Sequence, residues 1–166
     1  MRIGILSDTH DQLERTQTAV ATLIQAGAEL LIHCGDLTTP PIVHACTGLP
    51  ACFVFGNCDH DPAQLRAAIE RTGGRCLERG GLITVGQHRI AVTHGDSRLE
   101  VRRLLALEPD YLLTGHSHAP SDGREGRTRR INPGALHRAA VWSVAVLDLQ
   151  TDHLAMLTIP NSMMQP

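Results

Sequence analysis

Short apolar segments, most of them followed by a polar cluster, are the feature of this sequence that most restricts its fold. Those expected to form strands in the first two thirds of the chain are residues 3–6, 30–33, 52–55, 83–85, 90–93 and 111–114. Apolar runs of this length, without strict alternation, are typical of strands that are covered on both faces. Helical stretches alternate with them, so the order of elements predicts an α/β fold.

The polar clusters that follow these strands carry most of the reactive side chains. They are Asp8-Thr9-His10, Gly35-Asp36, Gly56-Asn57-Cys58-Asp59, His94-Gly95-Asp96 and Gly115-His116-Ser117-His118. In an open α/β sheet, ligands and catalytic groups collect beyond the carboxyl ends of the strands. We therefore expect all of these clusters to converge on one edge of the sheet.

The residue types in the clusters favour a metal site. Carboxylate, imidazole and amide groups, without thiolates, suit divalent ions such as Mn²⁺, Fe²⁺ or Zn²⁺. The candidate ligands are Asp8, His10, Asp36, Asn57, His94, His116 and His118. They are too many for one catalytic ion that keeps an open position, but they suffice for two ions that share a bridging carboxylate. Each motif alone is weak, and only their repetition after strands makes the signal specific.

The remaining histidines lack this context, and we expect surface or packing roles for most of them; they are His33, His44, His60, His88, His137 and His153. Helix starts are explicit where a capping residue precedes Glu or Gln by three positions, in the pairs Asp11 and Glu14, Asp61 and Gln64, and Ser97 and Glu100. This spacing is that of a capping box. Glycines at 27 and 73–74 predict where the first two of these helices end.

The length of 166 residues is that of one domain with its own hydrophobic core. No repeat or linker interrupts it, so residues 1–166 are expected to form a single domain. Beyond residue 128 the helical pattern stops. There, residues 128–132, 142–149 and 154–159 are expected to form a mainly antiparallel, C-terminal sheet.

Charge and composition exclude several classes of partner. The formal net charge is −2, which gives no electrostatic basis for general nucleic-acid binding. Two Phe, one Tyr and one Trp are too few for a base-stacking platform. The N-terminus has no signal-peptide pattern, and no apolar run is long enough for a membrane helix. With an odd number of cysteines and no CxxC pair, the chain is expected to be cytoplasmic with reduced thiols.

The ordered clusters together resemble the signature of the calcineurin-like metallophosphoesterase superfamily. The Gly56-Asn57-Cys58-Asp59 form and the Asn132-Pro133-Gly134 turn are similar to its small single-domain bacterial and archaeal phosphodiesterase branch. The resemblance extends from residue 3 to about residue 149. It implies an α/β fold of the metallo-dependent phosphatase type, a four-layer α/β/β/α sandwich of two mixed β-sheets, with the metals between the strand ends of the sheets.

The resemblance also implies two divalent ions. Mn²⁺ is the expected ion, with Ni²⁺, Fe²⁺ or Zn²⁺ as alternatives, and the resemblance indicates which ligands hold each ion. It assigns Asp8, His10 and His118 to the first ion, Asn57, His94 and His116 to the second, and Asp36 to both. The expected function is hydrolysis of a small phosphate ester, preferably a phosphodiester, by attack of a metal-bridging hydroxide.

The candidate catalytic residues are Asn57, Cys58 and His94. Many members of the superfamily have a histidine, their candidate general acid, where Cys58 stands, so this departure leaves the acid open between Cys58, His60 and solvent. Other departures are Asp96 and Ala135, where relatives of the small branch often have His and Ser. Asp59 is expected either to orient an imidazole or to cap a helix.

Two other functions remain open at this stage. A protein-binding scaffold is one, since the retromer subunit of the same fold works through its surfaces. The presence of the whole ligand set favours an enzyme over a scaffold. The second alternative, a dinucleoside polyphosphate hydrolase, would need a base-binding wall, for which the chain has few aromatic residues. The sequence does not fix the oligomeric state.

Overall fold

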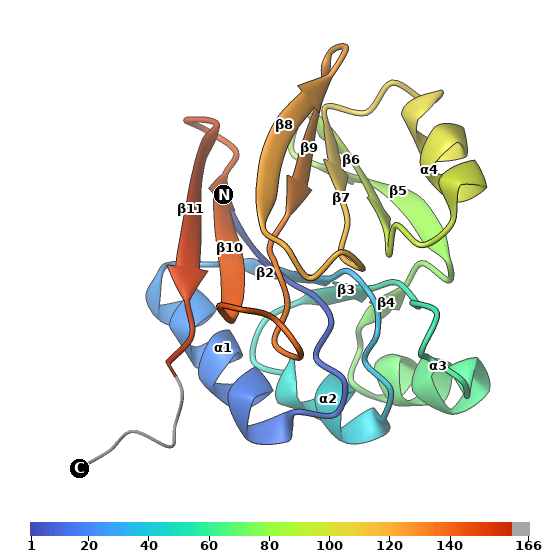
Figure 1. The fold of residues 1–166 in the computed structure, drawn as a ribbon, viewed down its shortest axis with the longest axis vertical. Coiled ribbons are helices and arrows are strands. Elements are labelled where there is room, and N and C mark those ends of the chain that lie inside the picture. Colours follow the sequence, from blue (N-terminus) through green and yellow to red (C-terminus); the bar gives the residue numbers. More distant parts are fainter. Residues whose placement is uncertain (161–166) are drawn as a thin grey trace.

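The computed structural model describes residues 1–160, so residues 161–166 of the expected domain lie outside the described residues. Strands and helices alternate from β1 to β4, α4 lies between β6 and β7, and the described chain continues after β7 as strands (Figure 1). The helices are α1 (Leu13–Gln25), α2 (Pro40–Ala45), α3 (Pro62–Arg71) and α4 (Arg98–Leu105). The strands are β1 (Arg2–Leu6), β2 (Leu30–His33), β3 (Ala51–Phe53), β4 (Arg75–Cys76), β5 (Gly80–Val85), β6 (His88–Thr93), β7 (Tyr111–Leu113), β8 (Ser121–Glu125), β9 (Thr128–Asn132), β10 (Ser143–Asp148) and β11 (His153–Thr158).

The strands form two mixed sheets. Sheet A has the order β11-β10-β1-β2-β3-β4, and sheet B has the order β5-β6-β7-β9-β8. In sheet A, β1, β2, β3 and β4 are parallel, whereas β10 and β11 pair antiparallel at one side. In sheet B, β6, β7 and β9 are parallel, with antiparallel β5 and β8 at the edges. The expected pair of mixed sheets is confirmed.

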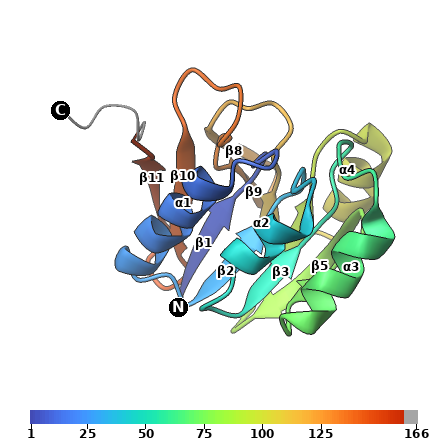
Figure 2. The same cartoon turned by 90° about the horizontal axis from the view of Figure 1, so that it is seen from below.

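Alternating side chains of the strands supply two different cores. Ile3 and Ile5 of β1 point between the sheets, where they pack with residues such as Ile90 and Leu113 of sheet B. The opposite face of sheet A packs against α1, α2 and α3, which lie below the sheet in Figure 1 and in front of it in Figure 2. A smaller cluster of Ala91, Leu104 and Leu112 joins sheet B to α4. These layers form the α/β/β/α sandwich that the family resemblance implied.

The helix starts at residues 61 and 97 are confirmed, and the one at residue 11 is wrong. Asp61 Oδ1 accepts from Gln64 N at 3.0 Å, and Ser97 Oγ accepts from Glu100 N at 3.3 Å. In contrast, α1 is preceded by Gln12 and has no side-chain cap. Asp11 has a φ of 62° and accepts a hydrogen bond from Thr39 instead. A contact distant in sequence has therefore replaced the local cap.

The expected separate C-terminal sheet is also wrong. β9 enters sheet B parallel to β7, while β10 and β11 extend sheet A beside β1. The side chains of β9 and β10 are largely buried, so each sheet gains one buried strand from this region. The two-residue β4, the exposed β8 and the short α2 were not predicted. Within residues 1–160, no helix is long and apolar enough to cross a membrane.

Candidate metal centre

The loops after β1, β2, β6 and β7 bring the predicted aspartates and histidines together. Their backbones adopt an unusual conformation at the ligand positions: φ is positive at Asp8, His10, Asp36, His116 and His118, between 41° and 68°. Non-glycine residues rarely adopt the left-handed region, and such strain concentrates at functional sites. The fold thus holds these side chains in place at a conformational cost.

Two buried carboxylates stand at the centre of the cluster. Asp36 Oδ2 lies 3.3 Å from His10 Nε2 and 3.4 Å from His94 Nε2. Asp8 Oδ1 lies 3.1 Å from His118 Nε2 and 3.9 Å from both His10 Nε2 and His94 Nε2. Asp8 and Asp36 are almost completely buried. Each carboxylate is therefore shared among several imidazoles rather than paired with one.

Several polar atoms at this centre are buried without a hydrogen-bond partner in the described part of the chain. They include Asp8 Oδ1, His10 Nε2 and His94 Nε2. A buried polar group without a partner costs free energy. Lone pairs of oxygen and nitrogen that face one another in this way fit a divalent cation, which would satisfy them together. The donor set and its geometry therefore fit the metals that the family implies.

The pKa shifts of Asp36 and His94 also indicate a site that favours a cation. Burial opposes ionisation of Asp36, but the His94 imidazole and the Cys58 N–H hold the pKa of this carboxyl below its usual range. Burial lowers the pKa of His94, but the neighbouring Asp36 and Asp8 carboxylates outweigh it and raise this pKa above the ordinary value. The two carboxylates therefore favour a cation beside His94, and a metal ion would compete with protons for its Nε2 atom.

Backbone carbonyls orient two of the imidazoles. His94 Nδ1 donates to Cys34 O at 2.8 Å, and His118 Nδ1 faces Arg138 O at 3.4 Å. With the proton on Nδ1, the Nε2 lone pair of each ring is directed at the carboxylates. This is the usual arrangement by which an outer partner fixes the tautomer of a metal-binding histidine.

Asp59 has a role in the centre that differs from both of its expected roles. Its carboxylate accepts from Gly56 N at 2.7 Å, Asp36 N at 3.0 Å and Thr38 N at 2.7 Å. It thereby joins the loops that follow β2 and β3, and it neither orients an imidazole nor caps α3. Gly56 is needed beside it, because a Cβ at this position would overlap the Asp36 side chain. This contact places Asp36 tightly against the loop after β3.

His33 is a residue of the site that the sequence reasoning missed. It is buried at the end of β2, and its Nδ1 accepts from Gly35 N at 3.2 Å. The proton of the neutral ring is therefore on Nε2, which donates to Thr9 Oγ1 at 3.1 Å, and Thr9 Oγ1 donates to Asp36 O at 3.1 Å. Burial lowers the pKa of His33 to about 3, which keeps the ring neutral. The sequence signal for a role of His33 in the site was its position immediately before Cys34-Gly35-Asp36.

Three of the predicted site residues are less buried than the two aspartates. Asn57 is exposed, and its amide donates to Cys58 Sγ at 3.3 Å. His116 is exposed, and its ring centroid lies 5.1 Å from that of His94. Its backbone N–H donates to Asp8 Oδ2 at 3.0 Å. Cys58 lies within metal-ligand reach of His10 and Asp36. Burial and the Asp36 charge raise the pKa of its thiol to about 11, so it is protonated at neutral pH.

The loop between β9 and β10 closes the side of the centre next to His118. Asn132 is buried and donates through its amide to Gly115 O at 2.7 Å and to Ser117 Oγ at 3.0 Å. Leu136 N donates to Asp8 O at 3.2 Å. The Asn-Pro-Gly turn therefore fixes two of the ligand-bearing loops relative to each other. Ala135 is buried and offers the site no hydroxyl.

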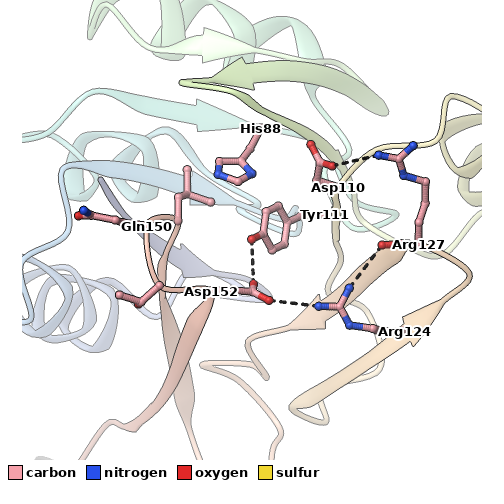
Figure 3. A pocket seen from close by; sticks show the side chains of 9 residues that line it. His88, Asp110, Tyr111, Arg124, Arg127, Gln150 and Asp152 are labelled. Atoms are coloured by element: carbon pink, nitrogen blue, oxygen red, sulfur yellow. Dashed lines mark hydrogen bonds and ion pairs between the residues drawn. The ribbon is translucent and has the colours of Figure 1, made fainter.

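A separate hollow of about 390 Å³ lies at the other end of the strands, where β7 begins and β10 turns into β11 (Figure 3). Its charges neutralise one another. Asp152 accepts from Tyr111 Oη at 2.8 Å and pairs with Arg124 at 3.1 Å, and Arg127 pairs with Asp110 at 3.7 Å. We therefore assign the reactive chemistry to the aspartate and histidine cluster and not to this hollow.

Comparison with known proteins agrees with this geometry. The model of the calcineurin-like phosphoesterase superfamily domain matches residues 1–152. The chain is 32% identical over 166 positions to the probable metallophosphoesterase YsnB of Bacillus subtilis, covering 92% of this chain and 86% of YsnB. It is 26% identical over 157 positions to phosphodiesterase MJ0936 of Methanocaldococcus jannaschii, covering 90% and 94%. The structure of an archaeal phosphodiesterase has a TM-score of 0.87 at 21% identity, covering 95% and 99%. With this match along most of its length, the chain belongs to the calcineurin-like phosphoesterase superfamily.

Proposed function

We propose that residues 1–166 form a single-domain, binuclear metal-dependent phosphodiesterase that hydrolyses small phosphodiesters. One observation carries the proposal: the buried Asp8 and Asp36 carboxylates are shared by His10, His94 and His118, whose Nε2 atoms face them at 3.1–3.9 Å. The family's enzymes named as phosphodiesterases support the same activity.

The arrangement of side chains supports the ligand distribution that the family implies. Asp8, His10 and His118 offer atoms within 4.8 Å of one another, which suits the first ion. Asp36 lies between His10 and His94 and would touch both ions. For the second ion, His94 is already oriented, whereas Asn57 and His116 would turn inward from their exposed positions. We propose Mn²⁺ as the first ion to test, since the oxygen and nitrogen donors suit it.

Two divalent ions held here would lower the pKa of a bound water and neutralise the charge of the phosphoryl oxygens. The side chains of the chain supply the rest. Cys34 O and Arg138 O keep His94 and His118 in their orientations. Asn57 can position the ester, because its exposed amide offers an N–H₂ donor at the rim of the centre. His94 is buried and held by Cys34 O, and we assign it to metal binding.

A scaffold function does not account for the same features. Buried carboxylates and imidazoles without hydrogen-bond partners destabilise a fold, and a surface-binding protein gains nothing from them. A dinucleoside polyphosphate hydrolase is disfavoured for a different reason. Phe53, Phe55 and Tyr111 are buried, and Trp142 is covered by the Arg15 guanidinium at 3.2 Å from its ring centroid. These side chains form no free wall on which a base could stack.

The direct test is a metal-dependent substrate assay. We expect the metal-free protein supplemented in turn with Mn²⁺, Ni²⁺, Mg²⁺ and Zn²⁺ to cleave an aryl phosphodiester readily and an alkyl phosphomonoester poorly. The monoester carries an additional negative charge and a leaving group that needs protonation. Rates with each ion, together with metal analysis of the purified protein, provide the measurement. Failure to cleave any phosphate ester with any of these ions would refute the function.

Cys58 provides a sharper prediction about the leaving group. Its protonated thiol is a weak hydrogen-bond donor and is poorly matched to general-acid work at neutral pH. Replacing Cys58 with Ala should leave aryl diester turnover within about tenfold of the wild-type rate, as expected for a group that transfers no proton. Replacing Cys58 with His should raise monoester hydrolysis relative to diester hydrolysis.

The exposed His60 is the matched alternative acid, and His60→Ala is measured beside the Cys58 variants. A collapse of diester turnover in Cys58→Ala, with both metals still bound, would show that the thiol is catalytic. A collapse confined to His60→Ala would assign the acid role to that histidine.

A further inference from the structure

His137 lies beside the metal centre, although its sequence context gave no indication of a role there. It belongs to the loop that connects β9 to β10. Its ring centroid is 4.9 Å from that of His10, and the two rings are tilted by 42°. His137 is half-buried, so the residue remains partly accessible to solvent beside its contact with His10. A molecule bound at the centre next to His10 would lie within its reach.

The backbone on both sides of His137 is held independently of its side chain. Leu136 N donates to Asp8 O at 3.2 Å, and Leu136 O accepts from the Arg15 guanidinium. On the other side, Arg138 O faces His118 Nδ1 at 3.4 Å. The loop is therefore fixed by its backbone, and the imidazole is not required to hold it. This leaves the ring free for an interaction with a ligand.

His137 does not belong to the metal-binding groups formed by the described residues. Those groups combine Asp8, His10 and His118, or Asp36 with His10 and Cys58, or both aspartates with His94. His10, His118, Arg138 and Arg15 lie near enough to act on the His137 ring, and the two Arg charges favour an anion beside it. The Asp8 and Asp36 carboxylates lie behind this group, against His118 and His10, and bound divalent ions would offset their charge.

We propose that His137 is a substrate-binding residue: an N–H of its imidazole donates a hydrogen bond to a phosphoryl oxygen of the ester held beside His10 and His118. A neutral imidazole has one N–H donor, which suffices for this contact. The assignment rests on the proposed phosphodiesterase function. It gives the β9–β10 loop a direct part in binding the phosphate, in addition to its contacts with Asp8 and His118.

The test compares His137→Ala and His137→Gln with His153→Ala as a matched histidine control. His153 is exposed at the start of β11, at the end of the strands opposite the metal centre. The Gln side chain retains an N–H donor. Calorimetry measures the Kd of inorganic phosphate for each Mn²⁺-loaded protein and, in a separate titration of each metal-free protein, the Kd of Mn²⁺. Steady-state rates give kcat and KM for an aryl phosphodiester.

We expect His137→Ala to raise the phosphate Kd and the KM by about tenfold or more, the effect of losing one hydrogen bond to a charged group. The Mn²⁺ Kd should be unchanged, His137→Gln should recover part of the loss, and His153→Ala should behave as wild type. An unchanged phosphate Kd would overturn the proposal. A higher Mn²⁺ Kd in His137→Ala would also overturn the proposal, because the ring would then act by packing against His10.

The phosphate titration separates this proposal from the function on which it rests. If the wild-type protein cleaved no diester, the phosphodiesterase function would fail. The effect of His137→Ala on phosphate binding would still decide whether this residue contacts a phosphoryl group.

Discussion

The Asp36→Asn variant should hydrolyse an aryl phosphodiester at least about 10²-fold more slowly than the wild-type protein. Asp36 Oδ2 lies 3.3 Å from His10 Nε2 and 3.4 Å from His94 Nε2, so this carboxylate contacts both halves of the centre. An amide is neutral and offers only one oxygen. The replacement should therefore weaken both metal sites, whereas His10→Ala or His118→Ala should mainly weaken the first.

Metal content and turnover are to be measured on the same samples of this variant. Asp61→Asn is the matched control, because Asp61 only caps α3 and asparagine caps helices about as well as aspartate. The control should retain wild-type rates and metal content. If Asp36→Asn bound two metals tightly and kept a near-normal rate, the bridging assignment would be wrong.

The sequence predicted the parts of the site that depend on local order. Polar clusters after apolar strands were correctly expected to meet, since the parallel strands β1, β2 and β3 end at the same edge of sheet A. The clusters after β6 and β7 come to the same place because sheet B packs on sheet A through their shared core. The caps at Asp61 and Ser97 depend on residues three positions apart, and local sequence was sufficient for them.

Interactions between segments that are distant in sequence account for the features of the site and fold that the sequence did not predict. Asp59 accepts from the backbone of Asp36 and Thr38, which are more than 20 positions away, so no local spacing predicted this role. His137 approaches His10 only because β9 and β10 belong to different sheets and the loop between them crosses the centre. The same division of strands explains why a separate C-terminal sheet was wrongly expected. Apolar periodicity predicts strands, but it does not specify the sheet that each one joins.

Strain and burial at the centre have a common physical basis. Several ligand positions adopt positive φ, and Asp8 Oδ1, His10 Nε2 and His94 Nε2 are buried without a hydrogen-bond partner among the described residues. Both features lower the stability of the metal-free fold. The cores on either side of sheet A supply the stability that keeps this arrangement in place. Metal binding would offset part of this loss in stability, so the thermal stability of the protein should report metal binding at the site.

Removal of the metals should therefore abolish hydrolysis and lower the Tm together. An ion that binds only the folded state stabilises it by about 2.7 kcal/mol when its concentration is 100 times its Kd. For a chain of 166 residues this corresponds to a Tm change of roughly 5 °C or more. Activity and thermal unfolding are measured before chelation, after chelation with verified metal loss, and after Mn²⁺ is restored. Asp36→Asn serves as the control and should show a smaller metal-dependent change in Tm. Undiminished hydrolysis by protein verified to be metal-free would exclude the proposed mechanism, and a Tm indifferent to Mn²⁺ would show that these residues do not hold the ion.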